Sequence, residues 1–244
     1  RLTSGTRADT LEPPMGDPGG GSDFAGFYNH FGIPNADWGF GGPSGIYHSA
    51  YDTFAWMEKF GDPGFLYHAT AARIGAAFAL RLANAEVLPY DYAEFARTMS
   101  RYLGPVERGL TQKGWSTAPV GELSKAITGM EQAARAFNEA RDAALAKGVS
   151  KAQRDMVNTQ LMLVERIFAR DSGLKSRPWY RTLIYASDVD NGYSSMVFPG
   201  VNEAIRYGTA TDTQAEVSDL VTRFGQAAAA LKVAQDALSA TPRK

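Results

Sequence analysis

The sequence predicts an α/β fragment followed by an all-α helical bundle. Residues 1–90 are rich in glycine, proline and aromatic residues, and they hold one plausible strand among short helical segments. From Tyr92 onward, each helical segment carries a single apolar stripe, which is typical of helices packed in a bundle. Leu88 precedes a proline, which disfavours helical backbone there. We therefore expect two domains, at residues 1–90 and 91–244.

The composition is that of an ordinary globular protein. The chain has 244 residues, of which 44% are hydrophobic and 21% are charged, enough to bury a sizeable core. The formal net charge of −1 gives no field that would recruit nucleic acid or an anionic membrane. The chain has no cysteine, so disulfides and thiolate metal sites are excluded. The most apolar run, residues 74–80, is followed by Arg81 and is too short to span a bilayer.

The first domain is expected to hold short elements and one long helix. Residues 1–22 have a loop composition, and Asp23 is placed to cap a short helix over residues 24–31 that Gly32 ends. A strand is expected at 36–40, then a turn at 41–45, and Asp52 or Thr53 caps the next short helix. The helix expected at 65–84 is apolar nearly all round, which predicts that it is buried between other elements.

The second domain is expected to consist of helices at 92–113, with a break near Gly104-Pro105, and at 121–147, 151–169 and 213–240. The last helix has the most regular stripe, with apolar residues three and four positions apart from Val217 to Leu238. Such a stripe is typical of a bundle or dimer seam. Residues 172–208 form a long, aromatic-rich insertion, and insertions of that length in a compact bundle are usually functional.

The candidate chemistry centres on Tyr47-His48, which follows a Gly/Pro-rich turn. We interpret His48 as one ligand of a metal site and Tyr47 as a polarising group beside it, although a lone histidine is more often structural. Zinc needs three or four ligands, and none of the three histidines has metal-binding spacing to another. A serine hydrolase is excluded, because Gly42-Pro43-Ser44-Gly45 does not have the spacing of a nucleophile elbow.

Several separate motifs, in order, give the chain a family resemblance from about residue 20 to its end. It resembles the carboxy-terminal part of the glutamate carboxypeptidase II-like zinc peptidases, which share a superfamily with the transferrin receptor. The motifs that carry the resemblance are Gly45-Ile46-Tyr47-His48-Ser49-Ala50-Tyr51-Asp52-Thr53, Leu88-Pro89-Tyr90-Asp91, Asn158-Thr159-Gln160-Leu161-Met162, Glu165-Arg166, Arg177-Pro178-Trp179-Tyr180-Arg181 and Phe198-Pro199-Gly200.

The resemblance implies the C-terminal piece of a zinc exopeptidase domain, a mixed sheet flanked by helices, followed by a helical domain that forms a homodimer. It implies a peptide substrate and two Zn²⁺ ions per active site. His48 would be the last zinc ligand in sequence, and Tyr47 would donate its hydroxyl to the oxyanion of the tetrahedral intermediate. Gly21, Ser22 and Tyr193 would bind substrate. The general base and the remaining ligands are expected upstream of Arg1, so this chain alone should be inactive. We expect a periplasmic or secreted parent protein.

Four positions depart from the glutamate-preferring members of that family. Ser22 replaces an asparagine of their Gly-Asn-Asp-Phe motif, and Gly192 replaces the lysine of a Lys-Tyr pair. Two arginines that hold an acidic side chain are Asp37 and Gly39 here. Because bidentate arginine contacts have no substitute in Asp or Gly, we expect no strong selectivity for acidic substrates. The sequence does not indicate which end of a peptide is trimmed.

Two other interpretations remain open. The chain could belong to a catalytically inactive, transferrin receptor-like dimerisation or binding module, which would have lost its metal ligands. The intact Tyr47-His48 pair favours the enzyme. A stand-alone interaction domain is disfavoured, because the predicted α/β layer has too few strands to cover its apolar helix.

Overall fold

A computed structural model describes residues 16–41 and 44–240 of the chain. The turn expected at 41–45 lies partly outside these residues, as does most of the loop expected at 1–22. The described residues form two compact units: residues 36–85 lie in one, and residues 17–35 together with 86–240 form the other. The units are described separately below, and the division into domains at residue 90 stays a prediction.

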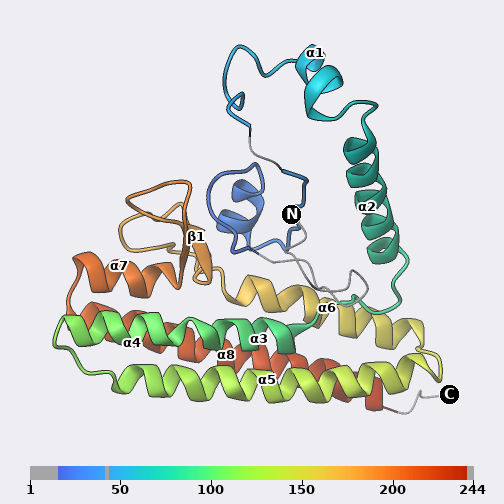
Figure 1. The fold of residues 1–244 in the computed structure, drawn as a ribbon. Helices are drawn as coiled ribbons and strands as arrows, with labels where there is room; N and C mark the ends of the chain where they lie inside the picture. The colour runs from blue at the N-terminus through green and yellow to red at the C-terminus, as the bar shows by residue number, and fades with distance from the viewer. Residues whose placement is uncertain (1–15, 42–43, 241–244) are drawn as a thin grey trace, which may run out of the picture. The chain divides into compact units, whose positions relative to one another are not determined.

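The larger unit is a bundle of long helices with a short hairpin (Figure 1). Helix α8 packs along both α5 and α6, and α3 packs along α5. The helices are α3 (Tyr92–Arg101), α4 (Leu103–Gln112), α5 (Ala118–Leu145), α6 (Lys151–Ile167), α7 (Pro199–Tyr207) and α8 (Ala210–Ser239). The all-α part of the predicted fold is confirmed, and the break expected near Gly104-Pro105 falls at Tyr102, between α3 and α4.

Polar side chains cap the starts of α3, α6 and α8. The Asp91 carboxylate accepts hydrogen bonds from the backbone N–H groups of Ala93 and Glu94 at the start of α3. Ser150 and Gln153 form a reciprocal capping box at α6, and Thr209 does the same with Asp212 at α8. Each cap satisfies N–H groups that have no partner within the helix.

The apolar stripe of α8 lies inside the bundle of a single chain. All its members are buried, and the Phe224 ring meets the Phe168 ring edge-on at a centroid distance of 4.8 Å. The stripe consists of Val217, Leu220, Phe224, Ala227, Leu231, Ala234 and Leu238. Of the two predicted roles for this stripe, the bundle seam is confirmed, and its use as a dimer seam is wrong because α5 and α6 already cover it.

The insertion between α6 and α8 contains the only strands of the described residues. Strand β1 (Tyr185–Ser187) pairs antiparallel with β2 (Ser195–Val197), with Ala186 opposite Met196. No strand forms at residues 36–40, so the expected strand is wrong and a mixed sheet is absent from the described part of the chain. The segment finds no pairing partner among the described residues, and a strand without a partner leaves its backbone groups to water.

The larger unit also contains a short helical turn from the start of the chain, η1 (Gly26–His30). A helix was expected here, and Gly32 ends it with a φ of 63°, a conformation that glycine adopts without strain. The expected cap is wrong: the helix begins after Ala25 and no side chain caps it, so Asp23 does not serve that role.

The smaller unit consists of α1 (Phe54–Trp56), η2 (Met57–Gly61) and α2 (Leu66–Ala83). The Thr53 side chain caps α1 by accepting a hydrogen bond from Trp56 N at 3.2 Å. Asp62 accepts hydrogen bonds from the backbone of Tyr67 and His68 and from His68 Nδ1. Burial alone would raise the pKa of Asp62, but the hydrogen bonds from His68 outweigh it and lower the pKa.

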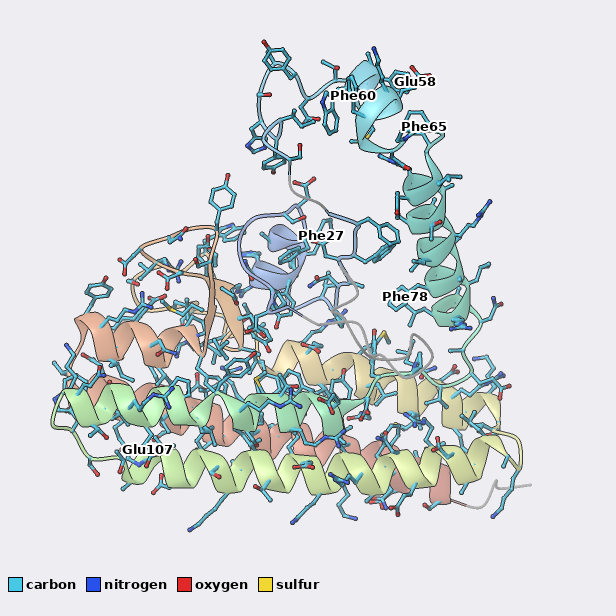
Figure 2. The ribbon with its side chains drawn as sticks, in the orientation of Figure 1. Phe27, Glu58, Phe60, Phe65, Phe78 and Glu107 are labelled. Atoms are coloured by element: carbon cyan, nitrogen blue, oxygen red, sulfur yellow. The ribbon has the colours of Figure 1, made fainter. Side chains whose placement is uncertain are left out.

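Helix α2 has no buried residue, contrary to the expectation that it is buried, although Ala71, Gly75 and Leu82 are half-buried. Phe78, labelled in Figure 2, is 45% exposed, and its ring centroid lies 6.0 Å from that of Trp38. Burial was expected because α2 is apolar on nearly every side. The described residues pack against it only in part, so its apolar side chains stay accessible. No helix in the described ranges combines the length and apolar character that crossing a bilayer requires.

One carboxylate makes the stability of the bundle depend on pH. Burial raises the pKa of Glu165 on α6 from its ordinary value of 4.5 to about 7. Between these two values the native state binds the proton that the unfolded chain releases, so this group lowers stability progressively as the pH rises from 4.5 to 7.

We expect Glu165→Gln to stabilise the bundle at pH 8 by about 1–2 kcal/mol, because the amide never ionises. At pH 5 the gain should be much smaller, since Glu165 is then protonated in the native state. Urea unfolding at both pH values measures the difference. Glu107→Gln, at an exposed position of α4 (Figure 2), is the matched control. An equal gain at pH 5 and pH 8 would contradict this account.

Candidate functional site

A strip of three glycines lies directly against the hairpin in the larger unit. We call residues 19–21 the glycine strip. A Cβ atom added to Gly20 would lie 2.3 Å from the Gly192 carbonyl oxygen and 2.5 Å from Ser187 Cβ. Such distances exclude any side chain at Gly20 without movement of the backbone. The Ser195 hydroxyl adds a 2.9 Å hydrogen bond to the Pro18 carbonyl oxygen.

The predicted substrate-binding residues Gly21 and Tyr193 are brought together by this packing. A Cβ atom on Gly21 would lie 3.2 Å from Tyr193 Cδ1, so the tyrosine ring lies over the glycine. Tyr193 is 74% exposed, and Gly21 and Ser22 are also exposed. One exposed surface therefore presents a phenol ring and a serine from segments that are far apart in the sequence.

Hydrogen bonds beneath the hairpin support this surface. The Ser187 hydroxyl donates to the Tyr180 hydroxyl at 2.9 Å, and the Tyr102 hydroxyl donates to the Asp17 carboxylate next to the glycine strip. These contacts were not predicted. The adjacency of three glycines and an Asn-Gly turn was the available signal, because both allow close approach of two backbones.

Tyr47 and His48 form a second pair, in the smaller unit. Their rings stack with a centroid distance of 3.8 Å and an interplanar angle of 22°. Tyr47 is 70% exposed, and His48 is also exposed. A turn closes beside them, where Ser49 N donates to the Ile46 carbonyl oxygen at 2.9 Å.

His48 has left-handed backbone, with a φ of 60°. A residue other than glycine rarely adopts this conformation, and such residues concentrate at functional sites. The observation agrees with a functional role for His48 but does not identify one.

The exposed imidazole of His48 fits the role of one zinc ligand. Among the described residues no group of three or more His, Cys, Asp or Glu side chains is arranged to hold a metal ion. Because zinc needs three or four ligands, the described residues do not complete a zinc site around His48.

A concavity of about 860 Å³ lies elsewhere in the larger unit, between residues 170–178, α7 and the start of α8. Its charged side chains pair with one another or with close neighbours. Arg170 binds Glu216 and Asp219, Lys175 binds Asp212, and Glu203 accepts from Arg177. These pairs stabilise the insertion against α8 and leave the glycine strip and hairpin as the better candidate site.

Comparison with known proteins identifies the class of the helical unit. Residues 119–232, from the start of α5 to α8, match the transferrin receptor-like dimerisation domain. The two peptidase-named relatives described next match 81% and 91% of the chain, so the resemblance of its motifs to the transferrin receptor-like peptidases is confirmed.

Three relatives illustrate the range of this group. The chain is 38% identical over 197 residues to the probable glutamate carboxypeptidase LAMP1 of Arabidopsis thaliana, covering 81% of this chain and 28% of that protein. It is 31% identical over 238 residues to the aminopeptidase NAALADL1 of Mus musculus, covering 91% and 32%. It is 26% identical over 223 residues to the inactive zinc metalloprotease C354.09c of Schizosaccharomyces pombe, covering 84% and 27%. The chain thus spans less than a third of the length of these relatives.

Proposed function

We propose that this chain is the C-terminal part of a two-zinc exopeptidase that hydrolyses peptides, in which the helical domain forms a homodimer and closes the substrate pocket. The observation that carries the proposal is the packing of Gly21 against Tyr193, two residues for which the family resemblance implies substrate binding. The names of the relatives from Arabidopsis thaliana and Mus musculus support a peptidase.

Each candidate residue has a specific role in this proposal. The His48 imidazole is one ligand of the metal pair, and the Tyr47 hydroxyl donates a hydrogen bond to the oxyanion that develops on the scissile carbonyl. A zinc pair supplies an activated water as nucleophile. Tyr193 is proposed to donate its hydroxyl to a carboxylate of the bound peptide, and the Ser22 hydroxyl is a second donor on the same exposed surface.

We further propose that the enzyme has no strong selectivity for acidic peptides. Gly192, beside Tyr193, contributes no charge to the surface where the glutamate-preferring family members place a lysine. Asp37 and Gly39 take the place of their two arginines. A charge-assisted contact contributes about 1.5–3 kcal/mol, so the loss of several removes the basis for a strong preference.

A panel of dipeptides assayed with the full-length parent protein tests both proposals. We expect zinc-dependent hydrolysis of Ala-Leu, Ala-Lys and Ala-Glu with kcat/KM values within about tenfold of one another. A chelator should abolish the activity, and added zinc should restore it. Marked selectivity for acetyl-Asp-Glu would contradict the proposed specificity, and a lack of hydrolysis of every peptide would contradict the enzyme.

The homodimer is proposed from the family of residues 119–232. Because the stripe of α8 is buried within one chain, the dimer contact must use the outer faces of the bundle. Sedimentation of the parent protein should give a dimer, and a monomer at micromolar concentration would contradict it.

An inactive binding module is the second candidate. The relative from Schizosaccharomyces pombe, named an inactive zinc metalloprotease, favours it. Zinc analysis of the parent protein separates the candidates, since the enzyme requires two bound ions and the inactive module would hold fewer or none.

A further inference from the structure

The turn that carries Tyr193 is held by a network of hydrogen bonds. The Asp188 carboxylate accepts from the backbone N–H groups of Asp190 at 2.8 Å and Asn191 at 3.3 Å. The Asn191 side-chain oxygen accepts from Tyr193 N at 3.2 Å. Asp188 N donates to the Ser194 carbonyl oxygen at 2.8 Å and closes the base of the turn. The carboxylate of Asp188 is thus the centre around which this turn is folded.

Arg206 of α7 binds the same turn from outside. Its two terminal nitrogens donate to both oxygens of Asp188, at 3.1 and 2.9 Å, and Nη1 also donates to Asp190 Oδ2 at 3.0 Å. The guanidinium lowers the pKa of Asp188 below its ordinary value, mainly through these hydrogen bonds. The Tyr207 hydroxyl adds a 2.6 Å contact to Asp190. We call Arg206, Asp188 and Asp190 the turn clamp.

The clamp starts from a helix that is itself fixed in the bundle. On α7, Val201 and Ile205 are buried, and Glu203 is held by Arg177 and by the Ser176 hydroxyl. Because α7 is packed into the bundle, the ion pairs of Arg206 hold the turn at a fixed place relative to the bundle. The glycine strip contacts the other side of this turn, at Gly192 and Tyr193.

We propose that Arg206 is a positioning residue that holds Tyr193 over Gly21, so that this part of the peptide site is formed before substrate arrives. The proposal rests on the proposed function of Tyr193. A preformed site avoids the ordering cost that a loop pays when it closes on a ligand. It also means that Arg206, the arginine of α7, is bound to Asp188 and Asp190 and does not serve as a counter-ion for acidic substrates.

Two variants of Arg206 test the proposal in the full-length parent. Arg206→Gln removes the ion pairs, whereas Arg206→Lys keeps the charge but cannot bind both Asp188 oxygens in the same way. Arg135→Gln is the control, because Arg135 makes a comparable pair with Glu131 on the exposed face of α5. The readouts are amide hydrogen exchange at residues 190–194 and the kinetics of Ala-Leu hydrolysis.

For Arg206→Gln we expect about tenfold faster exchange at residues 190–194, because the loss of charged hydrogen bonds favours local opening. KM should rise about tenfold with little change in kcat, because Tyr193 binds substrate and takes no part in the chemical step. Arg206→Lys should give intermediate values and Arg135→Gln none of these changes.

The possible results distinguish failure of the clamp, of the positioning role and of the proposed function. Unchanged exchange in Arg206→Gln would overturn the clamp. Faster exchange with an unchanged KM would overturn the positioning role, because the ion pairs would then contribute to stability alone. A wild-type parent that hydrolyses no peptide would contradict the proposed function instead, while the exchange measurement would still decide whether Arg206 fixes the turn.

Discussion

Replacing Phe224 by alanine should destabilise the helical unit by about 3–5 kcal/mol. Phe224 is completely buried in the middle of α8 and meets Phe168, which lies just beyond the end of α6. Truncation removes the transfer free energy of the ring and leaves a cavity that the surrounding helices fill only in part. Urea unfolding followed by circular dichroism measures the loss.

The expected loss is large relative to the total stability of a typical domain, about 5–15 kcal/mol. Phe224→Leu, with an expected cost of about 1–2 kcal/mol, keeps the test informative if the alanine variant does not fold. Val233→Ala is the control on the same helix: Val233 is 46% exposed, and alanine has the higher helix propensity. A loss below about 1 kcal/mol for Phe224→Ala would contradict the assignment of this residue to the centre of the core.

Replacing His48 by alanine in the full-length parent should abolish zinc-dependent peptide hydrolysis and leave the helical unit folded. Loss of one ligand from a metal site lowers affinity and disturbs the geometry of the remaining ligands. Tyr47→Phe should differ, because it removes only a hydroxyl donor: we expect zinc to stay bound and kcat to fall by about 10²–10³. Metal analysis and steady-state kinetics measure both effects.

His30→Ala is the matched control for these variants. His30 stacks on Trp179 and lies within 2.8 Å of its carbonyl oxygen, in the other compact unit. Its removal should leave zinc content and kcat unchanged. If His30→Ala and His48→Ala lower activity equally, a general loss of stability explains the result and the ligand role of His48 is wrong.

The bundle could be predicted from the sequence because local patterns determine it. The stripe from Val217 to Leu238 recurs at helical spacing and predicted the helix. Its start at Ala210 rather than at the expected residue 213 follows from the Thr209 cap, which was not predicted. The burial of α2 could not be predicted, since burial depends on what surrounds a helix and the apolar residues of α2 show only that it needs cover. The strand expected at 36–40 failed for a related reason, because a strand requires a partner that local sequence does not reveal.

The candidate site was predicted only in part. Family motifs indicated Gly21, Ser22 and Tyr193, and the structure places Gly21 against Tyr193. The turn clamp was not predicted, because Arg206 lies on a different element from Asp188 and nothing in their spacing indicates a contact. The only local signal was the Asp188-Val189-Asp190-Asn191-Gly192 turn, in which the partly buried carboxylate of Asp188 requires a partner.

The contact between the glycine strip and the hairpin has a consequence for how the chain folds. The hydrogen bond from Ser195 to Pro18 joins residues 177 positions apart in the sequence. Contacts of such long range close a large loop, so their entropy cost is met only after helices with local contacts have formed. The helices should therefore assemble early, and the surface that carries Tyr193 should be completed among the last steps of folding. A nascent or partly folded chain would thus have helical content before the surface of Gly21 and Tyr193 has formed.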